Sequence, residues 1–162
     1  MSKVDGLFGI YEVKRLVTSA QVGKWCRLPY KDHPRGCPNY GRPGCPPGAR
    51  SIVDLLDPEE PIYLVYAMFN LEYHAETMKL RHPEWTPRQC RNLLYWQNIV
   101  RKDLKSAVKA AMGFLRCDGV SYCPEGLGVN VFVTARLAGV KLDKIRRLKI
   151  DRHVALIGTK WP

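Results

Sequence analysis

The longest uninterrupted apolar pattern in the chain covers residues 62–69, IYLVYAMF, where aromatic and β-branched residues follow one another without polar alternation. Such a run is typical of a strand buried on both faces, so we predict a strand at the centre of a sheet. Residues 7–17 show imperfect alternation, which predicts a first strand or an extended arm. Residues 152–158 predict a closing strand near the other end of the chain.

Helical spacing of apolar residues predicts three helices between these strands. The first covers residues 71–80 and ends before a His-Pro pair. The longest covers residues 86–112, with Thr86 as its N-cap and proline at the first helical position. The third covers residues 130–137 and ends at Gly139, where a left-handed cap is expected.

The long helix is predicted to be amphipathic, with an apolar core face and a basic opposite face. Strands near both ends, one in the middle and helices between them make a small mixed α/β sandwich the simplest architecture. A chain of 162 residues and 18.5 kDa supports one hydrophobic core, so we expect a single domain over residues 1–162. The predicted core face of the long helix consists of Cys90, Leu93, Leu94, Gln97, Val100, Leu104, Ala107, Val108 and Ala111.

Residues 31–48, KDHPRGCPNYGRPGCPPG, form a segment with five prolines and four glycines in eighteen positions. This composition excludes a helix or a ladder-forming strand, so we expect an irregular loop. A loop of this length inside a compact domain is usually functional or disordered. Its two cysteines, Cys37 and Cys45, favour a functional, metal-binding loop.

The cysteines Cys26, Cys37 and Cys45 are separated by ten and seven residues, and none belongs to a CxxC pair. Structural zinc sites usually show paired spacings of two to four residues, so the pattern argues weakly against zinc. Iron-sulfur clusters accept wider spacing because each thiolate binds a different iron. The prolines that follow Cys37 and Cys45 reduce the entropy lost when the loop wraps a cluster. Idle free thiols are the alternative interpretation.

A fourth ligand is expected from a second loop that contains Cys117 and Cys123. We expect Cys123, because it is followed by proline like the two loop cysteines. Cys90 lies on the apolar face of the long helix and is interpreted as a buried thiol. If no fourth cysteine reaches the cluster, one iron stays open to water or substrate, which would indicate catalysis.

The motif GCPNYG followed by CPP, within residues 25–47, resembles the cysteine-rich motif of a family of predicted metal-binding proteins, which reads roughly GC-x-x-YG and then CPP. Residues 128–140 resemble the C-terminal motif of the same family. The resemblance implies an iron-sulfur cluster bound by Cys37 and Cys45. Cys26 matches the first cysteine of the family motif approximately, because an insertion separates it from the GC pair here.

Lys and Arg number 26 against 15 Asp and Glu, a net charge of +11 that exceeds what solubility requires and fits a polyanion partner. The basic residues concentrate on the long helix and in the C-terminal segment 136–160. Contact with a phosphate backbone and a merely solvated basic face remain alternative interpretations. The residues expected to contact nucleic acid are Arg91, Lys102, Lys105, Lys109, Lys144, Arg146, Arg147 and Lys149.

The sequence predicts a cytoplasmic protein without membrane contact. No stretch approaches the roughly 20 apolar residues of a membrane span. The N-terminal residues lack the apolar region and the cleavage site of a signal peptide. Motifs typical of phosphate-binding loops, dinucleotide folds and serine hydrolases do not occur.

Three functional hypotheses follow from these observations. The first is a protein that binds an iron-sulfur cluster of the 4Fe-4S type through Cys26, Cys37, Cys45 and Cys123, with sulfur transfer or desulfuration on an RNA or nucleotide substrate if one iron is open. The second is a zinc-stabilised module that binds nucleic acid without catalysis. The third is a small electron-transfer protein for a redox partner, which requires a complete shell of four cysteines.

Overall fold

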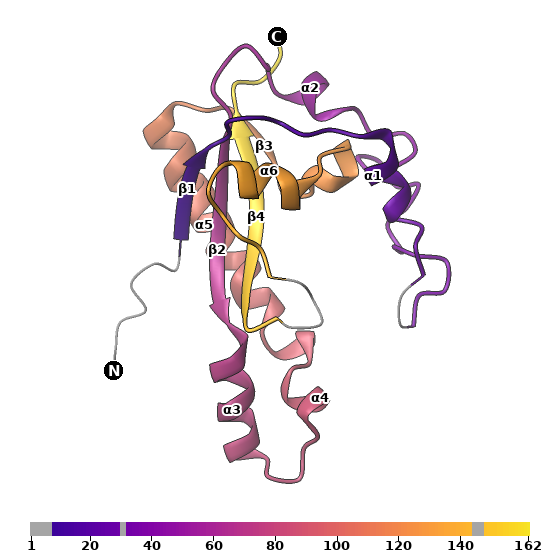
Figure 1. Cartoon of the computed structure of the whole chain (residues 1–162), viewed down its shortest axis with the longest axis vertical. Helices are drawn as coiled ribbons and strands as arrows, with labels where there is room; N and C mark the ends of the chain where they lie inside the picture. The colour runs from indigo at the N-terminus through magenta and orange to yellow at the C-terminus, as the bar shows by residue number, and fades with distance from the viewer. Residues whose placement is uncertain (1–7, 30–31, 144–147) are drawn as a thin grey trace.

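The computed structural model describes residues 8–29, 32–143 and 148–162 and contains a four-stranded antiparallel sheet in the order β1-β2-β4-β3 (Figure 1). The strands confirm the predictions for the beginning, the middle and the end of the chain. Strand β3 was not predicted, because its three residues are too few for a recognisable alternation. The bounds are Phe8–Glu12 for β1, Tyr63–Asn70 for β2, Gly119–Ser121 for β3 and Ile150–Gly158 for β4.

The central strands β2 and β4 are buried on both faces, as the apolar run of β2 predicts. They pair antiparallel over eight positions, with Leu64 opposite Leu156 and Val65 opposite Ala155. Val65 and Ala155 contribute to the core on one face of the sheet, and Leu64 and Leu156 to the core on the other. This alternation follows from the two-residue period of a strand.

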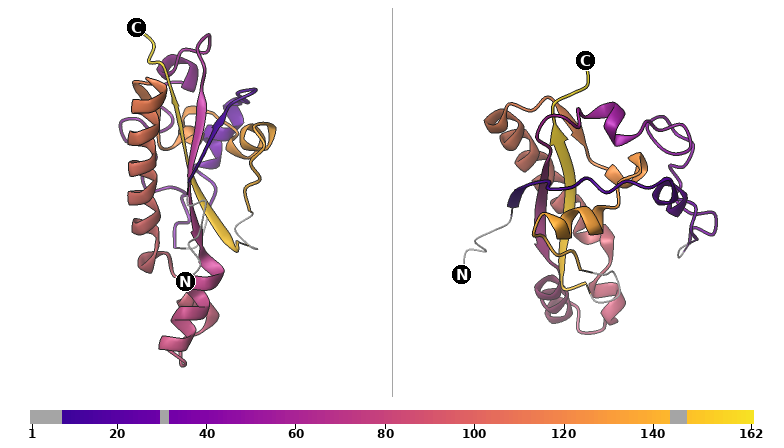
Figure 2. Two further views of the ribbon diagram at one scale, coloured as in Figure 1. Left: turned by 90° about the vertical axis from the view of Figure 1, so that its left-hand side faces the viewer. Right: turned by 45° about the horizontal axis from the view of Figure 1, so that its top comes forward.

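Helices cover both faces of the sheet, which confirms the mixed α/β class. Helix α5 (Gln97–Leu115) packs on one face against β2 and β4. Helix α6 (Val131–Leu137) lies on the other face (Figure 2), and α2 (Ile52–Leu55) packs into the same core cluster as α6. The remaining helices are α1 (Ala20–Trp25), α3 (Leu71–Arg81) and α4 (Pro87–Cys90), with short 3-10 helices at η1 (Leu93–Tyr95) and η2 (Pro124–Leu127).

Two of the three predicted helices form close to the predicted bounds. Helix α3 begins after Asn70, whose side-chain oxygen accepts from the backbone N–H of Tyr73 at 2.9 Å. Helix α6 begins after Asn130, whose oxygen accepts from the N–H of Val133. Gly139 follows α6 with a φ of +97°, the left-handed conformation expected after a helix end.

The predicted single helix over residues 86–112 is wrong, because the chain turns between α4 and α5. Thr86 does form the expected cap, a capping box with Gln89. Trp96 causes the break: its side chain is 2% exposed, and its indole N–H donates to the Arg91 carbonyl at 3.2 Å. Burying this large ring holds the backbone at Trp96 in a non-helical conformation, with φ at −140°.

The break also changes the predicted core face. Leu93 and Leu94 lie in η1 and are 51% and 83% exposed, so their assignment to the core is wrong. The later positions of the face are correct, since Val100, Leu104, Val108 and Ala111 are buried against the sheet. Among the described residues, no helix combines the length and the apolar character needed to cross a bilayer.

Candidate functional site

The cysteine-bearing loop, described from residue 32, contains neither helix nor strand up to residue 48, as the composition predicts. Backbone hydrogen bonds fold it into successive turns. The N–H of Cys37 donates to the carbonyl of Cys26 at 2.7 Å, and the N–H of Gly41 donates to the carbonyl of Pro46 at 2.7 Å. The first bond joins the end of α1 to the loop, so that Cys26 and Cys37 become neighbours.

Gly36 makes this junction possible. Its φ is +84°, and a Cβ at this position would lie 2.4 Å from the carbonyl oxygen of Cys26. The close approach of two backbone segments therefore requires a residue without a side chain. The glycine before Cys37 in the sequence motif has a structural reason that the sequence alone does not reveal.

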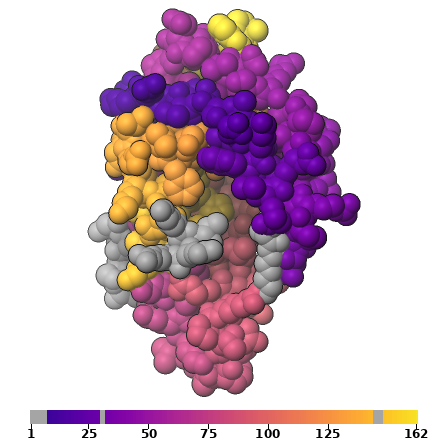
Figure 3. Space-filling view, turned by 45° about the vertical axis from the view of Figure 1, so that its right-hand side comes forward, coloured from indigo at the N-terminus to yellow at the C-terminus, as the bar shows by residue number. Residues whose placement is uncertain are grey.

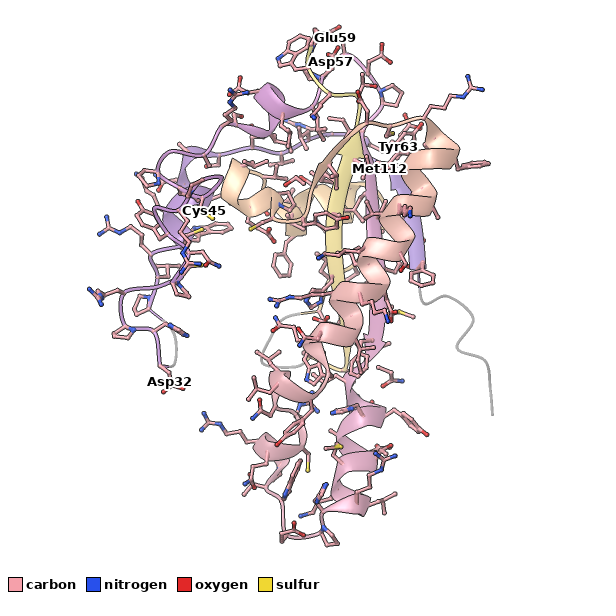
Figure 4. The ribbon with its side chains drawn as sticks, turned by 180° about the vertical axis from the view of Figure 1, so that it is seen from behind. Asp32, Cys45, Asp57, Glu59, Tyr63 and Met112 are labelled. Atoms are coloured by element: carbon pink, nitrogen blue, oxygen red, sulfur yellow. The ribbon has the colours of Figure 1, made fainter. Side chains whose placement is uncertain are left out.

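The second loop, which contains Cys123, lies beside the Cys45-Pro46 part of the cysteine-bearing loop. A Cβ on Gly126 would lie 3.6 Å from the sulfur of Cys123 and 3.7 Å from Cδ of Pro46. The Cys45-Pro46 segment therefore lies directly beside η2 and its preceding cysteine. Figure 3 shows the N-terminal segment and the loop packed along one side of the molecule, and Figure 4 shows Cys45 on the side of the loop that faces η2.

Charge interactions link Cys26 to Cys37 and Cys45, and Cys123 to Cys26 and Cys45. Burial raises the pKa of Cys26, and Cys37, Cys45 and the Glu125 carboxylate raise it further. Burial also raises the pKa of Cys123, with smaller contributions in the same direction from Glu125, Cys26 and Cys45. The backbone N–H of Gly126, which donates to the Cys123 carbonyl at 3.1 Å, acts in the opposite direction.

The other two cysteines lie outside this site. Cys90 is 2% exposed and buried, as its place on an apolar face predicts. Cys117 packs against the core between α5 and the sheet, and its thiol lies 3.9 Å from the Leu115 carbonyl. All six thiols are free. The preference for Cys123 over Cys117 as a neighbour of the loop cysteines agrees with this geometry.

Within residues 8–29, 32–143 and 148–162, no group of three or more His, Cys, Asp or Glu side chains forms a ready-made site for a metal ion. Three observations link the cysteine-bearing segments: the backbone hydrogen bond from Cys37 to Cys26, the position of Gly126 near both Pro46 and the Cys123 sulfur, and the charge interactions among the thiols.

The residues expected to contact nucleic acid fall into three groups. Lys102, Lys105 and Lys109 are exposed on α5. Arg91 does not lie on that helix, and its guanidinium donates to the carbonyl of Leu148. Lys149 is exposed and pairs with Glu72 at 3.5 Å. Lys144, Arg146 and Arg147 lie outside the described residues.

Sequence reasoning did not identify Glu125, whose carboxylate interacts with the thiols of Cys26 and Cys123 and with His153. Burial raises the pKa of its carboxyl group, while the Glu125 backbone N–H and His153 act in the opposite direction. His153 in turn contacts Asp151, with 2.5 Å between Nδ1 and Oδ2. These residues come from η2 and β4, so only the folded chain brings them together.

A hollow of about 710 Å³ adjoins the cysteines. Pro46, which follows Cys45 in the sequence, and Gly126 form part of its wall. Lys24 and Arg50 also line it, and no Asp or Glu does among the described residues. The charged side chains that line this hollow are therefore both basic.

Comparison with family models, with curated proteins and with solved structures finds no match to this chain.

Proposed function

We propose that this protein binds an iron-sulfur cluster of the 4Fe-4S type through the thiolates of Cys26, Cys37, Cys45 and Cys123. The observation that supports the proposal is the gathering of four cysteines from three separate segments of the chain. Cysteines without a common role would not be expected to lie near one another where α1, the cysteine-bearing loop and η2 adjoin. The resemblance of the loop motif to predicted metal-binding proteins agrees with this proposal and stays a prediction.

The four cysteine thiolates are suitable ligands for an iron-sulfur cluster. Thiolates are the soft ligands that iron-sulfur clusters require. Burial and mutual repulsion raise the pKa of Cys26 and Cys123, so their ionisation needs positive charge at the site. Iron supplies that charge, because a coordinating thiol loses its proton on binding. The backbone N–H of Gly126 would stabilise the resulting charge on Cys123.

The arrangement favours one-electron transfer over catalysis at an open iron. A bound cluster accepts and releases single electrons, and a shell of four cysteines leaves no ligand position free. Cys123 is exposed, so one edge of the site faces the surface where a redox partner would dock. Arg50 lines a hollow together with Cys123 and favours a partner with an acidic surface.

The test compares anaerobically purified wild-type protein with two matched variants. Wild-type protein should contain about four irons and four acid-labile sulfides per chain and absorb visible light. The Cys37→Ala/Cys45→Ala variant should lose iron and sulfide together. The Cys117→Ala variant should keep both, because Cys117 packs into the core and not into the site.

A third variant separates electron transfer from open-iron chemistry. Cys123→Ala should make the cluster oxygen-sensitive and prone to lose one iron, because one ligand position becomes open. A Cys123→Ala protein with unchanged iron content, stability and reduction potential would remove Cys123 from the ligand set and restore the sulfur-transfer hypothesis. Stoichiometric zinc without sulfide in the wild-type protein would contradict the cluster and leave the zinc-stabilised module.

A further inference from the structure

A second cavity lies away from the cysteines, where the end of β2 meets α3 and the beginning of α5. Its volume is about 680 Å³, within the range of small-molecule sites. None of its lining residues belongs to the cysteine site or adjoins it in the sequence. The lining includes Met68, Phe69, Asn70, Tyr73, His74, Thr77, Met78, Arg81, Tyr95, Ile99, Asp103 and Ile150.

Aromatic side chains form the walls of this cavity. The Phe69 ring is fixed by stacking on the buried Trp96, with 5.1 Å between ring centroids. Tyr73 and Tyr95 line the opening and are 68% and 50% exposed. Exposed aromatic rings around a cavity provide stacking surfaces for a planar ligand, and stacking of this kind accepts many ring systems.

His74 provides an unsatisfied polar atom inside this apolar lining. Its Nε2 atom is buried and has no hydrogen-bond partner among the described residues. Burial, followed by the charge of Arg81, lowers the pKa of His74, so the imidazole is neutral at pH 7. A buried polar group without a partner costs free energy, and a ligand that supplies the missing hydrogen bond recovers it.

Some of the remaining polar groups of the cavity already form hydrogen bonds within the protein, and others are available to a ligand. The Asn70 oxygen already caps α3, and the Thr77 hydroxyl donates to the Tyr73 carbonyl at 2.9 Å. Arg81 and Asp103 take part in no ion pair within the described part of the chain. The cavity therefore offers one cation, one carboxylate and one neutral imidazole to a ligand.

We propose that this cavity binds the base of a nucleotide, with the ring against Tyr95 and Tyr73 and a base nitrogen or amino group bonded to Nε2 of His74 once a rotation of the imidazole exposes that atom. Arg81 contacts the phosphate, and Asp103 accepts from an amino group of the base. A nucleotide combines what these groups require: a planar ring with donors and acceptors, joined to an anion. The net charge of +11 favours a phosphate-bearing ligand over neutral aromatic compounds.

The ligand is either a free nucleotide or an unpaired base of single-stranded RNA, because both present the same chemistry. Titration calorimetry with AMP, GMP, CMP and UMP measures the first source. Fluorescence anisotropy with labelled six-nucleotide RNAs of single composition measures the second. Adenosine and guanosine, which lack the phosphate, and ribose 5-phosphate, which lacks the base, show what each part contributes.

Three variants test the named contacts. Tyr95→Ala should weaken binding of the preferred ligand about tenfold or more, because stacking on its ring is lost. His74→Ala should weaken it about three- to tenfold through the lost hydrogen bond. Arg81→Gln should weaken the nucleotide but leave the matching nucleoside unchanged. Phe114→Ala is the matched control on α5: it is 85% exposed, lies outside the cavity and should leave affinity unchanged.

Three results would overturn the proposal. The first is the absence of binding by every nucleotide and RNA. The second is binding of RNA that none of the cavity variants weakens, which would assign it to the basic surface. The third is tighter binding of a free aromatic amino acid, with a loss on Asp103→Asn, which would identify an amino-acid site. Each binding measurement is repeated with metal-free protein. Its result therefore does not depend on whether the cysteines bind a cluster.

Discussion

The two central strands and the cysteine-bearing loop show two different ways of fixing a chain conformation. Leu64, Val65 and Ile157 in the strands are fully buried, with helices against both faces of the sheet. In the described residues 32–48, only Gly36 and Pro46 are buried. Apolar burial stabilises the sheet, whereas turns, prolines and one obligatory glycine shape the loop. We therefore expect the sheet to fold without a ligand, and the loop to gain its full order only when the proposed cluster binds.

The largest effect is expected from a cavity in the sheet core. Leu64→Ala should lower the free energy of unfolding by about 2–5 kcal/mol, because it removes buried methyl groups and leaves a void. Urea unfolding followed by circular dichroism measures this change. The control is Leu80→Ala on α3, where the side chain is 84% exposed and the change should stay within about 0.5 kcal/mol. Equal effects of the two variants would contradict the assigned core.

A smaller effect on stability is expected from a substitution where the N-terminal segment is hydrogen-bonded to α6. Thr134 is fully buried, and its hydroxyl accepts from the N–H of Val17 at 3.1 Å. Thr134→Val keeps the shape but leaves this N–H unsatisfied, so it should cost about 1–3 kcal/mol. Thr77→Val is the control, because that hydroxyl bonds the carbonyl of its own helix. A loss from Thr134→Val no greater than the control loss would show that the attachment does not need the hydroxyl.

A substitution at Gly36 should alter the cysteine-bearing loop while leaving the stability of the sheet largely unchanged. Gly36→Ala places a Cβ against the backbone at Cys26, whereas Gly44→Ala meets no atom within 4 Å. Both glycines have positive φ, so both variants share a cost of roughly 1–2 kcal/mol for the left-handed conformation. Only Gly36→Ala should also speed alkylation of Cys37 in metal-free protein and reduce iron content. Unfolding of the sheet, measured in urea, should change less than for Leu64→Ala in both variants.

Equal alkylation rates in the two glycine variants would show that the contact between the loop and Cys26 is not needed for the site. A loss of sheet stability as large as that of Leu64→Ala would show that the loop and the core unfold together. Either result would weaken the contrast between the two regions.

The smallest effect on stability is expected from a change of pH, and it arises from His74 in α3, next to strand β2. The pKa of His74 is lowered in the folded protein, so the unfolded chain binds a proton first as pH falls. Stability should therefore decrease on acidification below the unfolded pKa of about 6.5, until the folded group also titrates. His74→Gln should flatten this part of the curve, measured by urea unfolding between pH 5 and 8. An unchanged slope would show that His74 does not contribute.

Local sequence patterns predicted those elements whose formation depends on near neighbours. The run at residues 62–69 became β2, and Gly139 follows α6 in the left-handed conformation as expected. The helix over residues 86–112 failed because burial of Trp96 overrides helical periodicity. Spacing along one segment cannot reveal that a ring will be drawn into the core by a sheet formed elsewhere.

For the proposed site, the sequence indicated the cysteines and the irregular loop, and composition explains why. Proline and glycine exclude regular structure locally, and the cysteines stand out in a polar segment. The sequence did not reveal Glu125 beside the thiols, or the cavity around His74, because their residues come from elements far apart in the chain.

The sequence by itself determined the mixed α/β class, the irregular loop and a positive charge, because composition and periodicity act over a few residues at a time. Only the tertiary structure decided the strand order β1-β2-β4-β3 and the approach of η2 to α1 and to Pro46 of the cysteine-bearing loop. These depend on which distant surfaces bury each other, and that choice is made by the packing of the whole chain.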